Sequence, residues 1–459
     1  MEVLKGYEIV NATKGTVVRG DNATEFSGVS TDSRKINKGE LFIPIKGDNF
    51  DGHDFIHNAI EAGAAGYITH KDITTSEPIL AIKVKDTLEA MHNIALYYRN
   101  KFNVKIVAVT GSVGKTSTKD MIASVLGQKY NVLSTAGNLN NQIGLPLTLF
   151  NIDKTHEVVV TEMGMNSLGE IQTLSKIARP DIAVITNIGI AHIEKLGSRQ
   201  NILKAKMEIV QGLKPDGVLI LNGDDALLSE LKNFVKIKVK YYGTEQDADV
   251  HASNIRIESE EVLRFDVLTK SGEHTFSLPA PGRHNVYNAL SAIAVGLELD
   301  VDPKDIENGL KCYTQANMRM NIYSTDNGIK IIDDTYNANP QSMEAAINVL
   351  AEMKNYSRKI AVVGDMLELG NWSNNAHREI GRLLALKGIN YIITLGENAR
   401  NIANGAVEAG IPEDNVVMFD DAEDINTFLA NFIKNGDIIL VKGSRAMKME
   451  RIVEFIKNI

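Results

Sequence analysis

The chain has 459 residues, 44% of them hydrophobic and 23% charged, and its 58 acidic and 49 basic side chains give a net charge of −9. This length allows about three domains, and the lack of a basic block argues against a nucleic-acid partner. A single cysteine excludes an internal disulfide and predicts a reducing compartment. Because no apolar run is long enough for a signal peptide or a membrane span, we expect a soluble, cytoplasmic protein.

Residues 1–84 contain three short β-like runs (GELFIPIKG, AAGYITH, PILAIKV) and one segment with helical spacing, HDFIHNAIEAGA. This pattern predicts a small α/β domain. A helical segment then leads into VKIVAVTGSVGKTSTKDMIASVL, which reads as a buried strand, a glycine turn and a helix. Strand-like runs at HEVVVTEMG, PDIAVITNIG and DGVLILNGD follow and alternate with helices, which predicts a doubly wound, mostly parallel sheet.

The alternation of polar and apolar residues over 256–282 predicts antiparallel hairpins, and NVYNALSAIAVGLEL predicts a helix that closes the central domain. After residue 316 the βα alternation restarts in GIKIIDD, KIAVVGDM, NYIITLG and DIILVKG, which indicates a Rossmann-like domain. The predicted fold class is therefore α/β, with domains at 1–84, 85–315 and 316–459.

The segment VTGSVGKTST resembles a phosphate-binding loop, although the standard G-x-x-x-x-G-K-[ST] pattern would require a glycine where the chain has Val109. Gly111 and Gly114 still allow backbone N–H groups to approach a phosphate at a helix N-terminus. Lys115 adds a positive charge, and Thr116 offers a hydroxyl to a magnesium ion. A plain glycine turn is the alternative, but the position between an apolar strand and a helix favours nucleotide phosphate.

Other polar residues lie where the predicted strands end. Glu162 follows a buried strand and suits a magnesium ion beside a triphosphate, although it is equally typical of a helix cap or a solvated acid. His192 follows the next strand, where a lone histidine is more often structural than a ligand. Asn285 and Asn288 share one helix face by their i, i+3 spacing, and their amides are suited either to adenine or to a helix cap.

Ten segments, in this order and spacing, resemble the Mur ligase superfamily of ATP-dependent amide-forming enzymes. They extend over essentially the whole chain: STDSRKINKGELFIPIKGDNFDGHDF, TGSVGKTST, GNLNNQIGLPLTL, TEMGMNSLGEI, TNIGIAHIEKLGS, KAKMEI, GRHNVYNALSA, DDTYNANPQSM, GDMLELG and VKGSRAMKME. The family's loop has the shorter form G-[ST]-x-G-K-T, which accounts for Val109. The resemblance implies the three-domain Mur ligase architecture, with an N-terminal domain for a UDP-linked substrate, a central ATP-binding P-loop domain and a C-terminal Rossmann-like domain.

The resemblance further implies a cytoplasmic enzyme of peptidoglycan-precursor synthesis, expected to be a monomer, which uses ATP and two Mg²⁺ ions to join D-alanyl-D-alanine to UDP-N-acetylmuramoyl-tripeptide through an acyl phosphate. Another ligase of the superfamily is the first alternative. The ligase that adds the third residue should carry a D-N-P-R motif, which this chain lacks, and folylpolyglutamate synthetase lacks the N-terminal UDP-binding domain. A nucleotide-binding regulator is the second alternative, but it would need no second metal site.

Carried over position by position, the resemblance also implies roles for single residues. Catalytic roles fall to Lys115, His192, Lys206 and Arg319. Metal ligands are Thr116, Glu162, His192 and Lys206, the last as a carbamate and preferred to Lys204 by its spacing from His192. ATP contacts are Gly111, Ser112, Val113, Gly114, Lys115, Thr116, Ser117, Asn285, Asn288, Arg319 and Asp334.

In the N-terminal domain, the implied contacts to the uridine nucleotide are Ser33, Arg34 and Lys46. The implied acyl-phosphate region comprises Asn138, Asn140 and Asn141. Five further residues lie in family-like motifs of the C-terminal domain without an assigned role: Asn337, Asn339, His377, Lys442 and Arg445. Because Arg319 and Asp334 belong to a different predicted domain from the phosphate loop, catalysis is expected to require domain closure.

Overall fold

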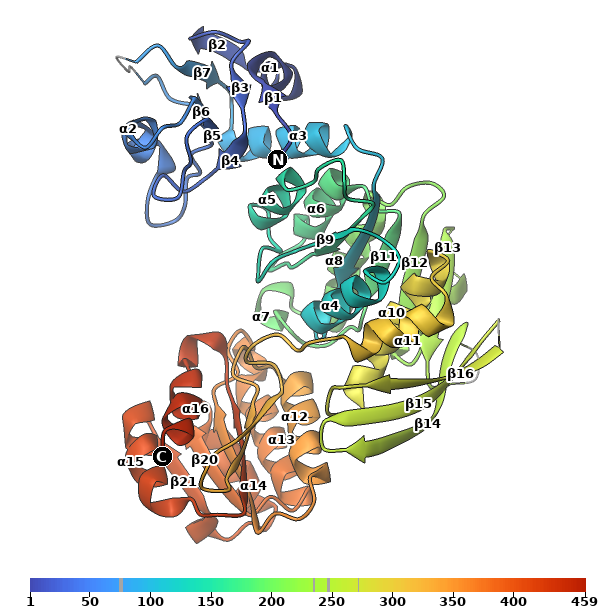
Figure 1. The fold of residues 1–459 in the computed structure, drawn as a ribbon. Coiled ribbons are helices and arrows are strands. Elements are labelled where there is room, and N and C mark those ends of the chain that lie inside the picture. The colour runs from blue at the N-terminus through green and yellow to red at the C-terminus, as the bar shows by residue number, and fades with distance from the viewer. Residues whose placement is uncertain (74–76, 234–235, 246–247, 271) are drawn as a thin grey trace. The chain divides into compact units, whose positions relative to one another are not determined.

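The computed structural model describes residues 1–459 except 74–76, 234–235, 246–247 and 271. Three large sheets and their helices follow one another along the chain (Figure 1), which confirms the predicted α/β fold class. By compactness the chain divides into one unit of residues 1–110, 129–184 and 207–219 and a second unit of residues 111–128, 185–206 and 220–459. The boundaries of the three predicted domains stay a prediction.

The first large sheet contains five strands and is parallel except for its β2–β7 edge. In spatial order the strands are β2 (Thr16–Arg19), β7 (Leu80–Lys83), β6 (Gly66–Thr69), β5 (Glu40–Phe42) and β4 (Gly28–Ser30). A separate antiparallel pair and three helical segments complete this region: β1 (Leu4–Lys5), β3 (Glu25–Phe26), α1 (Gly6–Thr13), η1 (Gly52–Phe55) and α2 (Ile56–Glu61). Apolar side chains of the five-stranded sheet and of its helices form a core that includes Phe42, Ile56 and Tyr67.

The helix α3 (Thr87–Arg99) leads to the second sheet, and Asp86 caps its N-terminus by accepting a hydrogen bond from Glu89 N. This sheet has nine strands. Their order is β16 (Gly272–Leu278), β15 (Val262–Thr269), β14 (Val250–Ser259), β13 (Lys238–Gly243), β12 (Val218–Asn222), β11 (Ile182–Ile185), β8 (Lys105–Thr110), β10 (Val158–Glu162) and β9 (Val132–Ser134). The β8, β10 and β9 pairings are parallel, whereas β14, β15 and β16 form the predicted antiparallel hairpins.

The helices that follow these strands are α4 (Lys115–Leu126), α5 (Gly144–Phe150), α6 (Glu170–Ala178), α7 (Ile193–Leu196), α8 (Arg199–Met207), η2 (Glu208–Gln211), α9 (Ala226–Ser229), η3 (Glu230–Asn233), α10 (His284–Glu298) and α11 (Pro303–Lys311). α10 is the predicted closing helix and is buried along most of its length. It packs on α4, which α11 also contacts. The helix that follows the phosphate loop is therefore held by apolar neighbours.

The third sheet has six strands, parallel except for the antiparallel β17–β18 edge. Its order is β17 (Asn321–Ser324), β18 (Lys330–Asp333), β22 (Asp437–Lys442), β19 (Arg358–Gly364), β20 (Tyr391–Leu395) and β21 (Val416–Phe419). The surrounding helices are α12 (Pro340–Glu352), η4 (Gly370–Trp372), α13 (Ser373–Leu386), α14 (Arg400–Glu408), η5 (Glu413–Asn415), α15 (Ala422–Phe432), η6 (Arg445–Met447) and α16 (Glu450–Lys457). α15 and α16 pack against the strands through Leu429 and Ile452, while α12 and α14 contact β22 and β20.

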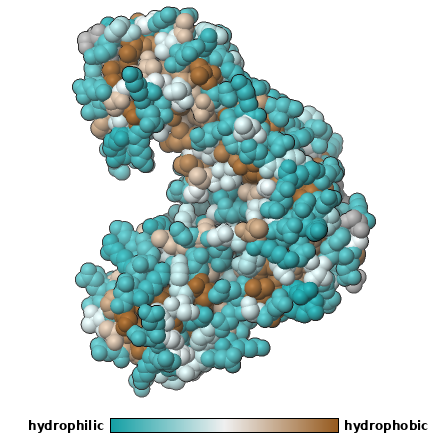
Figure 2. Space-filling view, viewed as in Figure 1, coloured by the Kyte–Doolittle hydropathy of each residue, from teal (hydrophilic) through white to brown (hydrophobic). Residues whose placement is uncertain are grey.

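None of the described helices is both long enough and apolar enough to cross a bilayer. The face drawn in Figure 2 is mostly hydrophilic, with hydrophobic residues scattered over it.

Candidate active site

The phosphate-loop segment forms the predicted turn between β8 and α4. Gly114 precedes the first residue of α4 in the left-handed conformation, at φ 83°. A Cβ atom at this position would lie 2.6 Å from Asn288 Oδ1, so both the backbone conformation and the close approach require glycine. Lys115 Nζ donates to the carbonyl oxygen of Gly111 at 3.0 Å, which lays the side chain back over the loop. The ammonium group thus stands beside the N–H groups at the start of the helix, an arrangement suited to phosphate.

The loop that follows β11 fixes the shape of the phosphate loop. Asn187 Oδ1 accepts from Val113 N at 3.0 Å, and Asn187 Nδ2 donates to Val113 O at 2.9 Å. Ser112 N donates to Asn187 O at 3.1 Å, and Ser112 Oγ accepts from Gly189 N at 2.8 Å. Sequence patterns carried no signal for this role of Asn187, because the contact joins segments more than 70 residues apart.

Asn285 and Asn288 lie on one face of α10, as their spacing predicts, and both are buried. Asn285 Nδ2 donates to Pro281 O at 2.7 Å, and Asn288 Nδ2 donates to Asn285 Oδ1 at 2.9 Å. Asn288 Oδ1 also accepts from Thr118 Oγ1 of α4 at 3.1 Å. In this structure Asn288 links α10 to the phosphate-loop helix and Asn285 orients the Asn288 amide, and the predicted adenine contact stays a prediction.

Lys115, His192 and Lys206 are brought together in the structure. Lys206 of α8 is 2% exposed, and burial together with the charge of Lys115 holds its pKa well below the ordinary value. Burial also lowers the pKa of His192, against the opposing effect of Glu368, and both lysines lower it further. Lys204 is exposed on the same helix. Burial therefore distinguishes Lys206 from Lys204, in agreement with the choice based on the family spacing.

Thr116 and Glu162, the other predicted metal ligands, are buried oxygen donors. Thr116 lies in the first turn of α4, and Glu162 ends β10, opposite Val109 of β8. Asn140 Nδ2 donates to Glu162 Oε1 at 2.8 Å. Among the described residues no group of three or more His, Cys, Asp or Glu side chains forms a metal site, so the predicted ligand set depends on the hydroxyl and the modified lysine.

Three family models match the chain: "Mur ligase family, catalytic domain" at residues 25–102, "Mur ligase middle domain" at 109–296 and "Mur ligase, glutamate ligase domain" at 318–445. A Bacillus subtilis protein named UDP-N-acetylmuramoyl-tripeptide–D-alanyl-D-alanine ligase is 42% identical over 448 residues, which cover 97% of this chain and 96% of the relative. The chain belongs to the Mur ligase family. It is an ATP-dependent, amide-forming ligase.

Solved Mur ligase structures agree over the full length. MurF from Acinetobacter baumannii has a TM-score of 0.93 and 33% identity, with 100% of both chains covered. MurF from Thermotoga maritima, crystallised in complex with ADP, has a TM-score of 0.82 and 30% identity and covers 94% of this chain and 97% of its own. These likenesses confirm the three-domain Mur ligase architecture.

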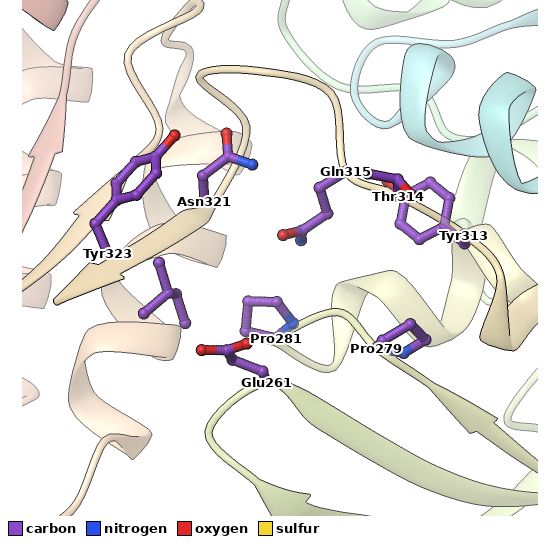
Figure 3. A pocket seen from close by; sticks show the side chains of 9 residues that line it. Glu261, Pro279, Pro281, Tyr313, Thr314, Gln315, Asn321 and Tyr323 are labelled. Atoms are coloured by element: carbon purple, nitrogen blue, oxygen red, sulfur yellow. The ribbon is translucent and has the colours of Figure 1, made fainter.

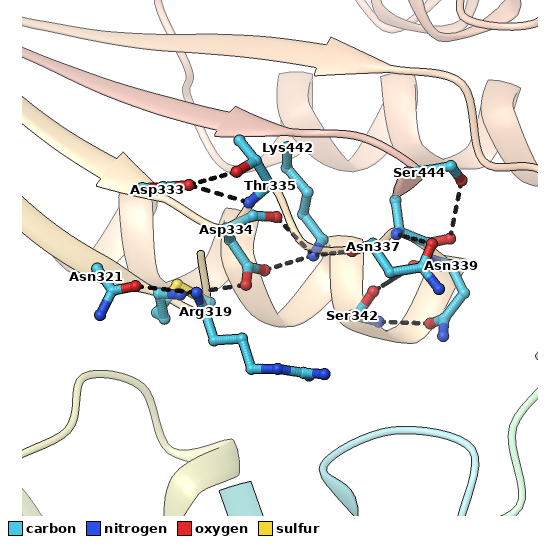
Figure 4. Close-up of polar contacts among 12 residues, drawn as sticks. Arg319, Asn321, Asp333, Asp334, Thr335, Asn337, Asn339, Ser342, Lys442 and Ser444 are labelled. Carbon is cyan, nitrogen blue, oxygen red and sulfur yellow. Dashed lines mark hydrogen bonds and ion pairs between the residues drawn. The ribbon is translucent and has the colours of Figure 1, made fainter. Parts of the chain in front are cut away.

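In the glutamate ligase domain of this Mur ligase, polar residues gather at the carboxyl ends of β18 and β22 (Figure 4). Asp334 pairs with the buried ammonium of Lys442, which also donates to Asn337 O at 2.9 Å. The guanidinium of Arg319 lies over the Tyr336 ring at 4.1 Å, and its side chain extends away from this cluster. The Asp334 carboxylate therefore has internal partners in this structure, and its predicted ribose contact stays a prediction.

The other C-terminal motif residues support the fold. Asn339 caps α12 by accepting from Ser342 N at 2.9 Å. His377 is fully buried, where its Nε2 accepts from Met366 N at 2.9 Å and its Nδ1 lies 2.7 Å from Ser373 O. Arg445 forms an ion pair with Glu450 at 2.9 Å. These contacts show that the motif residues contribute to the fold of the C-terminal region.

The predicted substrate residues of the first unit lie in loops. Arg34 is exposed and binds Asp32 through two hydrogen bonds of 2.9 Å, while Ser33 is half-buried and Lys46 is exposed. Asn141 accepts from Gly144 N at 2.9 Å and holds the start of α5, and Asn138 is exposed. The structure thus leaves their ligand roles as predictions.

A cavity of about 260 Å³ that no sequence motif marked lies beside the segment joining α11 to β17 (Figure 3). Its lining comprises Glu261, Pro279, Pro281, Tyr313, Thr314, Gln315, Asn321, Ile322 and Tyr323. Tyr313, whose pKa burial raises to about 12, also bonds to Ser117 in the first turn of α4. The connecting segment therefore touches the phosphate-loop helix.

Proposed function

We propose that this Mur ligase joins D-alanyl-D-alanine to the terminal carboxylate of UDP-N-acetylmuramoyl-tripeptide. The relatives that support this activity carry it in their names and match over nearly the full chain. The observation that carries the chemistry is the convergence of Lys115, His192 and Lys206 beside the start of α4. Lys115 supplies positive charge there, and the lowered pKa values of His192 and Lys206 favour their neutral forms, which suits a reaction that brings two anions together beside metal ions. Its use of ATP favours the cytoplasm as the place of action.

The reaction has two steps. The tripeptide carboxylate attacks the γ-phosphorus of ATP, and the bond to the bridging oxygen breaks to give an acyl phosphate and ADP. The amine of D-alanyl-D-alanine then attacks the acyl carbon, loses a proton and expels phosphate to form the amide. Two unit charges about 4 Å apart interact by about 4 kcal/mol at an effective dielectric of 20. Lys115, and Arg319 after domain closure, would offset this repulsion between carboxylate and triphosphate.

Magnesium fits the donor set that the sequence predicted, because hydroxyl and carboxylate oxygens suit this ion. Thr116 and Glu162 would hold one Mg²⁺, and His192 with the carbamate of Lys206 would hold the second. When bound, the ions neutralise charge on the phosphates. The chain's part is to keep Glu162 oriented through Asn140 and to keep Lys206 buried.

Carbamylation of Lys206 is supported by its burial and by the neighbouring cation. Both lower its pKa and so favour the neutral amine, the form that adds to carbon dioxide with loss of a proton. We expect Lys206→Ala to be nearly inactive and to recover partly with a short-chain carboxylic acid. The exposed Lys204→Ala variant should keep full activity. Full activity of Lys206→Ala without rescue would contradict the carbamate.

The substrate is tested by measuring phosphate release with UDP-N-acetylmuramoyl-tripeptide and ATP and each candidate amine in turn. D-alanyl-D-alanine should support turnover, whereas L-lysine and glutamate should not. Release with L-lysine or glutamate but not with D-alanyl-D-alanine would assign the chain to another branch of the family. ATP hydrolysis that ignores every amine would favour a nucleotide-binding regulator.

A further inference from the structure

Arg319 stands between two residues whose backbone is in the left-handed conformation. Met318 has a φ of 60°, and Met320 has a φ of 57°. Methionine rarely adopts this conformation, so two such residues on either side of one arginine indicate a segment that its surroundings hold in place. Strained backbone of this kind is common at functional sites, where it fixes the direction of a side chain.

The loop that follows β18 holds this segment. Tyr336 N donates to Met318 O at 3.1 Å. Met320 N donates to Asp334 Oδ1 at 3.2 Å. One hydrogen bond thus lies on each side of Arg319, and the position of its Cα atom is fixed before the side chain contacts any ligand.

The guanidinium of Arg319 lies on the face of a neutral ring. Its central carbon is 4.1 Å from the centroid of Tyr336. The acid that this segment contacts, Asp334, pairs with the buried ammonium of Lys442, and the arginine side chain extends away from that pair (Figure 4). A ring contact orients a cation through the ring quadrupole and supplies no neutralising negative charge. The charge of Arg319 therefore stays available to an anion.

A second arginine of the same domain shows the structural alternative. Arg358 of β19 also lies near a tyrosine ring, 5.3 Å from the centroid of Tyr391. Its guanidinium, however, pairs with the buried carboxylate of Asp437 at the start of β22 and donates to Phe432 O at 2.8 Å. Arg358 thus serves to join strands, whereas the neutral ring beside Arg319 orients a cation without such a bond.

The charge of Arg319 acts close to the phosphate-loop helix. Tyr313, which follows α11, bonds to Ser117 in the first turn of α4. Burial raises the pKa of Tyr313 to about 12, while Ser117 and the positive charge of Arg319 act in the opposite direction. The guanidinium therefore lies within electrostatic range of a residue that contacts α4. A cation in this place suits the negative charge of a phosphoryl group during transfer.

We propose that Tyr336 is a positioning residue, whose ring holds the Arg319 guanidinium in the orientation in which it meets the γ-phosphate. The proposal rests on the proposed function, in which Arg319 offsets the charge of the triphosphate. The left-handed segment sets the point from which the side chain starts, and the ring sets where its charged end lies. Because both restrict the rotamers of Arg319, less conformational entropy is lost when the phosphate binds.

Steady-state kinetics test this role. Tyr336→Leu removes the ring and should lower kcat about tenfold, because the cation–π contact is lost. KM for UDP-N-acetylmuramoyl-tripeptide and for D-alanyl-D-alanine should stay constant. Tyr336→Phe keeps the ring face and should keep the wild-type kcat. Tyr336→Met, whose side chain is flexible and lacks a ring, should behave as Tyr336→Leu does and replaces it if that variant does not fold.

The matched control is Tyr391→Leu. It removes the ring beside Arg358 but leaves the ion pair between Arg358 and Asp437 in place. This variant should lower the urea midpoint of unfolding and keep the wild-type kcat. A purely structural role of Tyr336 would give the same pattern for Tyr336→Leu.

Calorimetry provides a readout that needs no turnover. The full-length wild type and its variants are titrated with ADP and with AMP-PNP, an ATP analogue that resists phosphoryl transfer, in the presence of Mg²⁺ and UDP-N-acetylmuramoyl-tripeptide. Tyr336→Leu and Arg319→Ala should each weaken AMP-PNP binding about tenfold and leave ADP binding unchanged, since only AMP-PNP carries a γ-phosphate. The double variant should bind AMP-PNP as Arg319→Ala does, because the ring acts only through the arginine.

The outcomes separate this proposal from the proposed function. If the wild type releases phosphate with D-alanyl-D-alanine, but Tyr336→Leu matches Tyr391→Leu in kcat, the positioning role is wrong and the proposed function stands. A loss of affinity in Tyr336→Leu that is equal for ADP and AMP-PNP, or that adds to the loss in Arg319→Ala, would show a structural role and overturn the proposal. If the wild type releases no phosphate with D-alanyl-D-alanine, the proposed function is wrong, and the role of Tyr336 is wrong with it.

Discussion

At the scale of single residues, Gly114 combines two constraints that can be separated by mutation. Its φ of 83° costs an alanine about 1–2 kcal/mol. In addition, an alanine Cβ would lie 2.6 Å from Asn288 Oδ1, which already accepts from Thr118. We therefore expect Gly114→Ala to shift the start of α4 and to reduce ATP-dependent turnover about 100-fold or more, because the N–H groups would no longer point at the phosphates.

The matched control is Gly388→Ala. Gly388 has a similar φ of 68°, but no neighbouring atom lies within 4 Å of the place that an alanine Cβ would take there. It should lose about 1–2 kcal/mol of unfolding free energy, measured by urea denaturation, and keep full turnover. If Gly114→Ala lost only as much stability as Gly388→Ala and retained turnover, contact with Asn288 would not matter to the loop.

At the scale of elements, the phosphate loop depends on the loop after β11. Asn187→Ala would remove both hydrogen bonds to Val113, so that the N–H of Val113 would lose its partner while its carbonyl would keep only the bond from Thr186 Oγ1 at 2.6 Å. A lost hydrogen bond of this kind costs about 1–3 kcal/mol, so we expect KM for ATP to rise about tenfold. Asn151→Ala removes an exposed bond to Leu147 O and should leave KM unchanged. An unchanged KM in Asn187→Ala would mean that the phosphate loop keeps its shape alone.

The same two loops show what the sequence could predict and what it could not. The order strand, glycine turn, helix followed from local residue types, and so did the helix α10, because periodicity and turn chemistry act over a few residues. The choice of Lys206 over Lys204 came from family spacing, and burial now supports it. The hydrogen bonds of Asn187 to the phosphate loop and of Asn288 to α4 join segments that are far apart in the sequence. Local sequence patterns carry no information about such contacts. The sequence therefore predicted that Asn285 and Asn288 share a helix face, but it did not predict their structural hydrogen bonds.

At the scale of the molecule, the proposed catalytic cycle needs the glutamate ligase domain to move, and one contact within the second unit is suited to that. His192 Nδ1 pairs with Glu368 Oε2 at 2.6 Å, and Glu194 N donates to Glu368 O at 3.4 Å. The Glu368 side chain is 58% exposed, and exposed ion pairs contribute only about 0–1 kcal/mol. A contact with so small a free energy can favour one position of the domain and still break when the domain moves.

The single tryptophan reports on this contact, because Trp372 ends η4, which packs on α7, and is 51% exposed. We expect Glu368→Ala to shift Trp372 emission to longer wavelength and to increase its quenching by acrylamide, since η4 would separate from α7. High salt should move the wild type in the same direction only at a pH below the lowered pKa of His192, where the imidazole is protonated and the pair is ionic. The exposed Glu413→Ala variant should match the wild type. Identical emission and quenching in Glu368→Ala and the wild type, at low and at high salt, would show that the His192 pair does not hold η4 against α7 in solution.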